Sequence, residues 1–154
     1  MTLLNRLPIF PLYYSGNTKF SPIHCSDLTD VILQVINKNI QSNIIECVGP
    51  EILSLRNILE KLLLSIDKKR LLIPLPNVIA KITASFFQLF PKPLLTVDQL
   101  KLLKYDNVIS GKYKTNADIG VPALRLFDEE LNKYSYMWRE NGQFSKKDYD
   151  FKNN

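Results

Sequence analysis

Glycine is scarce in this sequence: five of the 154 residues are glycine, and no two of them lie within one tight turn. A dinucleotide-binding βαβ unit needs several glycines in one strand-to-helix turn, because the pyrophosphate must approach the backbone at the helix N-terminus. The glycines here are Gly16, Gly49, Gly111, Gly120 and Gly142. This spacing excludes a glycine-rich phosphate loop, so we expect that this chain alone binds no dinucleotide cofactor.

The residue pairs of common catalytic sites are missing as well. Some hydride-transfer enzymes place a lysine four positions after a tyrosine on one helix, where the lysine lowers the tyrosine pKa. None of the seven tyrosines has a lysine at that position. His24 is the only histidine, and no nucleophile elbow or metal-ligand spacing accompanies it. We therefore predict no catalytic residue and no metal ligand, and we expect His24 to be structural or to form the wall of a pocket.

The cysteine content and the lack of long apolar segments favour a reducing, cytoplasmic compartment. Cys25 and Cys47 form no CxxC motif, and no apolar secretory segment is present. No run of roughly 18 apolar residues could span a membrane. We expect a cytoplasmic protein with both thiols reduced, acting as small apolar side chains; a peripheral position on the inner membrane is the alternative.

The charge of the chain is mildly basic, with a formal net charge of +5. Lysines are spread along the sequence, and the nearest approach to a basic cluster is Lys68, Lys69 and Arg70. A solvated surface is the favoured interpretation of this cluster, and contact with phosphate or anionic lipid is the alternative. No aromatic and basic pattern typical of single-strand binding is present, so we expect no nucleic-acid partner.

The first half of the chain reads as alternating strands and helices. Residues 1–18, with two prolines before a Ser-Gly-Asn turn, are expected to contain no helix or strand. A short extended segment at 19–23 precedes a helix capped by Asp27 and ending near residue 37. Predicted strands at 43–48 and 71–73 flank a helix capped by Ser54, with apolar residues at Leu55, Ile58, Leu59, Leu62, Leu63 and Ile66.

The second half reads as helical. An amphipathic helix is expected at 77–90, which could lie on a membrane surface or pack against a missing sheet or partner. Thr96 and Gln99 resemble a capping box that opens a helix to about residue 104. Residues 105–125 read as a loop, and Asp128 starts a last helix that reaches Trp138. Three short strands do not form a self-sufficient parallel sheet, so we expect them to need neighbours from outside this chain.

Four segments resemble a known family. TKFSPIHCSDL (residues 18–28), ECVGPEILSLR (46–56) and LIPLP (72–76) are similar to segments of extended and atypical short-chain dehydrogenases/reductases that follow the active-site helix. LTVDQL (95–100), continuing to DNVIS (106–110), resembles the branch that contains the nucleotide-binding accessory subunit of respiratory complex I and its bacterial relatives. The resemblance covers residues 7–140, which match only the back half of the family.

The resemblance implies an α/β fold class: the substrate-side, C-terminal portion of a Rossmann-like fold, mostly helical with about three short strands. The N-terminal dinucleotide-binding half, which holds NAD(P) in the family, would be absent. Phe20, Pro22 and His24 match the segment that borders the substrate cleft. Asp106 and Asn107 are expected to form a turn, with a polar wall of that cleft as the functional alternative.

The resemblance also implies one domain and a tail. Residues 1–140 would form the substrate-side part of the family's domain, and residues 141–154 a polar flexible tail. Cys25 and Ser26 depart from the family's usual Val-Asp or Gly-Asp pair, so the cleft chemistry does not carry over.

Three functions fit these observations. The first is a non-catalytic fragment or accessory module of an NAD(P)-binding, short-chain dehydrogenase-like protein, for which the resemblance suggests a link to respiratory complex I. The second is one chain of a split NAD(P)-dependent oxidoreductase or epimerase, completed by a separate N-terminal chain. The third is a peripheral membrane or assembly factor that uses the helix at 77–90.

Overall fold

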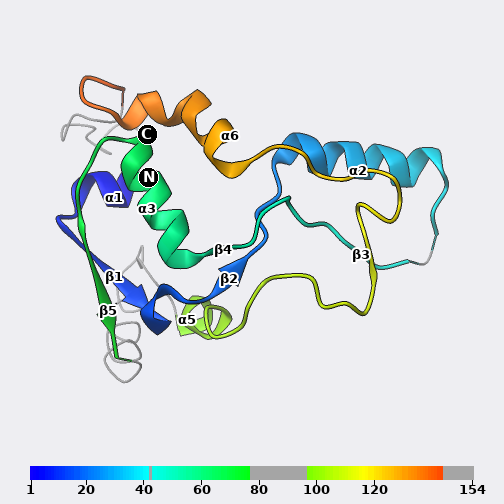
Figure 1. The fold of residues 1–154 in the computed structure, drawn as a ribbon, viewed down its shortest axis with the longest axis horizontal. Helices are drawn as coiled ribbons and strands as arrows, with labels where there is room; N and C mark the ends of the chain where they lie inside the picture. The colour runs from blue at the N-terminus through cyan, green and yellow to red at the C-terminus, as the bar shows by residue number, and fades with distance from the viewer. Residues whose placement is uncertain (42, 77–96, 144–154) are drawn as a thin grey trace, which may run out of the picture.

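The computed structural model describes residues 1–41, 43–76 and 97–143. They form a mixed arrangement of helices and small sheets, which confirms the expected α/β class (Figure 1). The helices are α1 (Thr2–Arg6), α2 (Cys25–Asn37), α3 (Leu55–Ser65), α5 (Val97–Leu102) and α6 (Phe127–Tyr134), with the 3-10 helices η1 (Tyr14–Gly16) and η2 (Ser135–Trp138). The strands are β1 (Ile9–Tyr13), β2 (Lys19–Phe20), β3 (Ile45–Glu46), β4 (Leu53–Ser54), β5 (Leu71–Leu75) and β6 (Lys114–Thr115).

The N-terminal segment was predicted to be irregular, and this prediction is wrong. It contains α1 and β1, and β1 pairs with β5 in parallel from Ile9 opposite Leu71 to Tyr13 opposite Leu75. Pro11 lies inside β1. A strand with one partner leaves half of its N–H groups unpaired, so it tolerates proline where a central strand does not. The predicted strand at 71–73 therefore has a neighbour within the chain itself.

The main core lies between α3 and the β1–β5 sheet. Ser54 caps α3 as predicted, since its hydroxyl accepts a hydrogen bond from the Asn57 N–H at 3.1 Å. The apolar face of α3 supplies Leu59 and Leu63, which are buried together with Leu12 of β1. The periodicity that predicted this helix therefore also identified its buried face.

The start of α2 differs from the prediction that Asp27 caps the helix. The N-cap is His24, whose Nδ1 accepts a hydrogen bond from the Ser26 N–H at 3.2 Å. The helix thus begins three residues earlier, and Asp27 lies buried in its first turn. Histidine can replace the usual Asp or Ser because its ring nitrogen is a hydrogen-bond acceptor at a similar distance from the backbone.

Two small sheets connect the middle of the chain to the segment that was predicted to be a loop. β2 pairs antiparallel with β4, and Phe20 also forms a parallel bridge with Asn107. β3 pairs in parallel with β6. The strand predicted at 43–48 is therefore shorter than expected, and residues 105–125 contain a strand that joins it.

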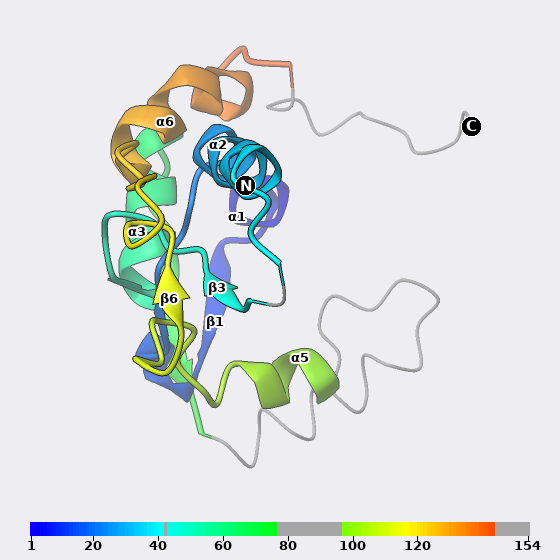
Figure 2. The same cartoon turned by 90° about the vertical axis from the view of Figure 1, so that its right-hand side faces the viewer.

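Figures 1 and 2 place α6 and α5 at opposite ends of the molecule, with the sheets between them. α5 agrees with the helix predicted after Thr96. α6 begins at Phe127, one residue before the predicted Asp128, and continues as η2 to Trp138. The amphipathic helix expected at 77–90, the cap at Thr96 and most of the expected tail lie outside the described residues.

Candidate functional site

The five predicted cleft residues lie at two places. Pro22 and His24 line a small cavity between the start of α2 and α6. Phe20, Asp106 and Asn107 do not line this cavity; they form the junction between β2 and the loop that follows α5. Whether these side chains border a substrate cleft stays a prediction.

The cavity is small, with a volume of about 120 Å³. Its wall combines residues from the segment before α2 with residues from α6 and the two positions before it: Pro22, Ile23, His24, Arg125, Leu126, Phe127, Glu130 and Tyr134. Cavities that enclose a drug-sized ligand measure roughly 300–1,000 Å³. This cavity can therefore receive a small group or one end of a ligand, but it cannot enclose a dinucleotide.

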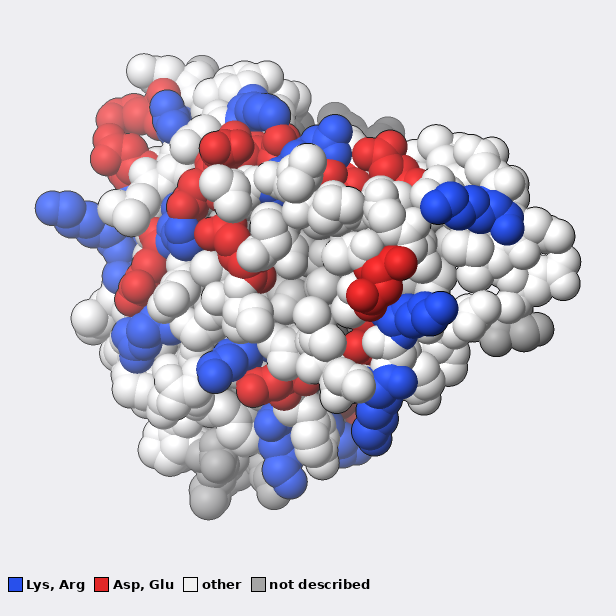
Figure 3. All heavy atoms as spheres, turned by 45° about the vertical axis from the view of Figure 1, so that its right-hand side comes forward, with Lys and Arg blue, Asp and Glu red and all other residues white. Residues whose placement is uncertain are grey.

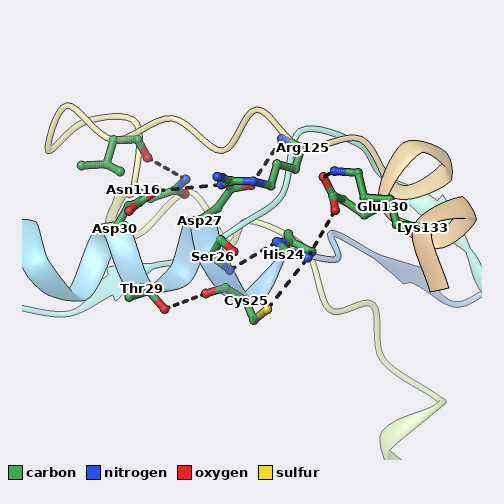
Figure 4. A network of polar contacts seen from close by, with 11 residues as sticks. His24, Cys25, Ser26, Asp27, Thr29, Asp30, Asn116, Arg125, Glu130 and Lys133 are labelled. Atoms are coloured by element: carbon green, nitrogen blue, oxygen red, sulfur yellow. Dashed lines mark hydrogen bonds and ion pairs between the residues drawn. The ribbon is translucent and has the colours of Figure 1, made fainter.

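His24 connects the cavity wall to the helix cap (Figure 4). Its Nδ1 is occupied as the acceptor of the Ser26 N–H, so the neutral ring carries its proton on Nε2. Nε2 lies 3.6 Å from Oε2 of Glu130 and 3.9 Å from Sγ of Cys25. The ring thus offers no free lone pair to a substrate, which supports a structural His24 at the cavity wall.

Glu130 is the acidic group of the cavity and lies mostly buried in α6. Its Oε1 accepts a hydrogen bond from Nζ of Lys133 at 2.6 Å. This bond, with the charges of Lys133, His24 and Arg125, lowers the pKa of the Glu130 carboxyl below its ordinary 4.5 against the opposing effect of desolvation. Glu130 is therefore ionised at neutral pH and serves as an anion that orients cations, not as a proton donor.

Asp27 and Arg125 form the second polar contact beside the cavity. The Arg125 guanidinium donates to Oδ1 of Asp27, and the Arg125 backbone N–H lies 3.3 Å from Oδ2. Asp27 is buried, whereas the Arg125 side chain is 39% exposed and also lies 3.8 Å from Oδ2 of Asp30. The pair fixes the segment before α6 against the first turn of α2, and thereby shapes the cavity.

Asn116, in the segment directly after β6, lies near Asp27 and Arg125 (Figure 4) and is almost completely buried. Its Oδ1 accepts from the Val48 N–H at 3.0 Å, and its Nδ2 donates to the Val121 carbonyl at 3.1 Å. Sequence reasoning missed Asn116, Arg125 and Glu130. They lie in or after a segment with little periodicity, and the contacts that place Asn116 and Arg125 span 68 and 98 residues of the chain.

Asp106 has a different partner from the one expected. It was predicted to bond its own turn, but its Oδ1 accepts from the Lys19 N–H at 2.8 Å. The backbones of Asn107 and Lys19 are joined by a bond of 2.8 Å, and the Ser21 N–H donates to the Asn107 carbonyl at 3.1 Å. Asp106 and Asn107 therefore hold the loop that follows α5 to β2. Most of these contacts are hydrogen bonds between backbone groups.

The two cysteines are free, Cys25 exposed and Cys47 half-buried. Burial raises the pKa of the Cys47 thiol, so it stays protonated and unreactive at neutral pH. Among the described residues, no three His, Cys, Asp or Glu side chains are grouped closely enough to hold a metal ion.

The acidity of Glu130 gives a test of the cavity. Because its pKa is lowered in the folded state, its stabilising contribution is present above about pH 4.5 and lost as pH falls through the lowered value. We expect the thermal midpoint of the natural chain to fall more steeply between about pH 5 and pH 3 than that of Glu130→Gln. Glu129→Gln, an exposed neighbour, is the control and should keep the natural slope. Equal slopes for all three chains would contradict this electrostatic role.

No family model matches the chain, and no curated protein matches it in sequence. The resemblance to short-chain dehydrogenases/reductases therefore stays a prediction. Across the residues that the structure describes, no helix is both long and apolar enough to cross a membrane. On the face shown in Figure 3, basic and acidic side chains are interspersed, with neither sign forming a continuous field.

Proposed function

We propose that this chain is an accessory module of a short-chain dehydrogenase-like protein, which binds a second polypeptide and has no dinucleotide site of its own. The second polypeptide would be a separate dinucleotide-binding chain or a subunit of a respiratory complex. Any oxidoreductase or epimerase activity would belong to the assembly. The observation that carries the proposal is an uncovered apolar face on α2.

The apolar side chains of α2 are only partly covered in the structure. Val31 is 2% exposed, but Ile32 is 52%, Leu33 51% and Ile36 67% exposed. The spacing of three and four residues places these last three side chains together along one side of the helix. A contiguous exposed apolar stripe of this kind is typical of a surface that binds another protein.

The sheets support the same conclusion. Among the described residues each sheet has two strands, and two of the three are parallel. Parallel sheets normally occur with both faces covered by other elements. In the β1–β5 pair, however, Ile9 is 51% and Leu71 60% exposed. A partner that packs over Ile9 and Leu71 would cover the exposed apolar side chains of this sheet, as is usual for parallel strands.

The chemistry of the cavity fits a module better than a complete enzyme. The cavity of about 120 Å³ is too small for a dinucleotide, and the lone pair of His24 Nδ1 is already used. The sequence has no glycine-rich phosphate loop and no tyrosine followed by lysine at the fourth position. We propose that this cavity forms one wall of a larger cleft that exists only in the assembly.

The apolar face of α2 gives the first test. We expect Ile36→Glu and Ile32→Glu to abolish recovery of a partner that co-purifies with the natural chain from its own cells, because a charge cannot be buried in an apolar contact. Leu102→Glu introduces the same charge at a side chain that is 73% exposed on α5, and should leave recovery unchanged. Equal recovery with all variants would exclude α2 as the contact.

Calorimetry with NADH and NADPH gives the second readout of the same proposal. The purified chain should show no binding, whereas the co-purified assembly should bind one of the two cofactors. Micromolar binding by the chain alone would overturn the proposal. A partner with a glycine-rich phosphate loop and a Tyr-x-x-x-Lys pair would indicate the split-enzyme form, and a respiratory-complex subunit the accessory form.

A further inference from the structure

A second hollow lies on a different part of the molecule, between α3 and the start of β5. It measures about 480 Å³, which is four times the volume of the cavity at His24. Its lining residues are Arg56, Glu60, Leu63, Leu64, Lys68, Lys69, Arg70 and Leu72. Four of these eight side chains are basic, one is acidic and three are leucine. We refer to this hollow as the basic groove.

The cations of the basic groove are only partly neutralised. Arg56 lies 3.9 Å from Glu60, a separation at which an exposed ion pair contributes little. Lys68 and Lys69 make no side-chain hydrogen bond or ion pair with the described residues. The two lysine ammoniums are thus available to a ligand, and together with Arg56 they make the groove attractive to carboxylates.

The backbone beneath these lysines is fixed by two sets of hydrogen bonds. The Asp67 and Lys68 N–H groups donate to the carbonyls of Leu64 and Leu63 at 3.1 and 3.0 Å. With Asp67 at a φ of 53°, this is the Schellman pattern that ends a helix. Arg70 then donates to the carbonyls of Leu4 and Asn5, which ties the turn to α1.

The apolar part of the basic groove has an exposed anchor point. Leu64 is 80% exposed on α3, directly beside the lysines, while Leu63 belongs to the buried core. A ligand in the basic groove would therefore meet the exposed Leu64 side chain next to the lysine ammonium groups. That combination fits an extended segment that carries both apolar and acidic side chains.

We propose that the basic groove binds an acidic peptide segment of a partner protein, with carboxylates on Lys68 and Lys69 and an apolar side chain against Leu64. A flat anionic membrane fits less well, because a hollow of about 480 Å³ beside the lysines gives an apolar side chain of a peptide a place to pack. Because the backbone of the turn is already fixed by hydrogen bonds, binding has to order only the lysine side chains and not the turn itself. This site is separate from the α2 face and does not depend on it.

The experiment uses fluorescence anisotropy with the full chain and a short fluorescein-labelled peptide of glutamates, serines and two leucines. We expect saturable binding that weakens as salt is raised, because the contacts are charged and exposed. The double variant Lys68→Glu, Lys69→Glu should weaken binding about tenfold or more. Leu64→Gln should also weaken it, and the exposure of that side chain keeps the core intact.

Two controls separate this site from general charge attraction. The double variant Lys104→Glu, Lys112→Glu makes the same change of charge at exposed lysines outside the groove, and should bind the peptide normally. A peptide with lysines in place of the glutamates should not bind. Equal loss in both double variants would overturn the proposal. So would the absence of saturable peptide binding, including a result in which only phosphatidylglycerol vesicles bind.

Discussion

Gly49→Ala is expected to destabilise the chain by about 3 kcal/mol, which lowers the thermal midpoint by roughly 10 °C in a protein of this size. A Cβ atom at position 49 would lie 1.8 Å from the carbonyl oxygen of Pro22 and 2.6 Å from its carbonyl carbon. Both atoms belong to the backbone, so relief requires the two segments to separate. The Gly49 N–H also donates to the Ser21 carbonyl at 3.3 Å, and that bond would be lost.

Gly111→Ala is the matched control for this change. Gly111 has a φ of 73°, but a Cβ atom there would meet nothing within 4 Å. Its substitution should therefore cost only the backbone term of about 1 kcal/mol. Thermal unfolding followed by circular dichroism measures both variants. If the two midpoints fall equally, the close approach of Gly49 to Pro22 does not contribute to stability.

Asp27→Asn is expected to destabilise the chain by about 2 kcal/mol, since it removes a buried carboxylate that accepts two hydrogen bonds from Arg125. The amide can still accept one bond, but it brings two donors to a buried position and loses the charge. Because Arg125 is partly exposed, its guanidinium can regain water, which keeps the loss below that of a fully buried pair.

Asp30→Asn is the control for the Asp27 substitution. Asp30 lies 3.8 Å from the same guanidinium, but its side chain is 56% exposed, so its removal should cost under about 0.5 kcal/mol. Denaturant unfolding of both variants, and of each combined with Arg125→Ala, measures the two coupling energies. Coupling of Arg125 to Asp27 should exceed its coupling to Asp30. The reverse order would contradict the assignment of Asp27 as the main partner.

Gly49→Ala and Asp27→Asn both test how the segment that follows β2 is held in place. Gly49 packs against this segment at Pro22, and Asp27 connects the helix that follows it to the start of α6. The cavity at His24 lies between these two contacts. Loss of either contact should therefore change the cavity before it unfolds the α3 core, which is built from different residues.

Sequence patterns correctly predicted those elements that are set by interactions between residues close together in the chain. The cap at Ser54 and the apolar face through Leu63 were correct, because a cap and an amphipathic helix are set by residues three and four positions apart. The prediction failed in residues 1–18, where prolines suggested a loop. β1 forms there because β5, about 60 residues later, supplies its hydrogen-bond partners.

Of the five residues proposed for a substrate cleft, Pro22 and His24 line the cavity, and His24 also caps α2. Whether they border a substrate cleft stays a prediction. Arg125 and Glu130, which complete the cavity, carried no signal in the sequence because neither belongs to a recognisable motif. Asp106 and Asn107 hold the loop that follows α5 to β2 and do not line the cavity.

The sequence by itself determined which local motifs are absent: its glycines are not clustered into a phosphate loop, and no tyrosine has a lysine four positions later. It also determined the helices whose faces repeat every three to four residues. Tertiary structure alone decided that Asp27 pairs with Arg125, that Gly49 touches Pro22, and that one side of α2 stays uncovered. These outcomes depend on contacts between residues far apart in the chain, and local periodicity carries no information about such contacts.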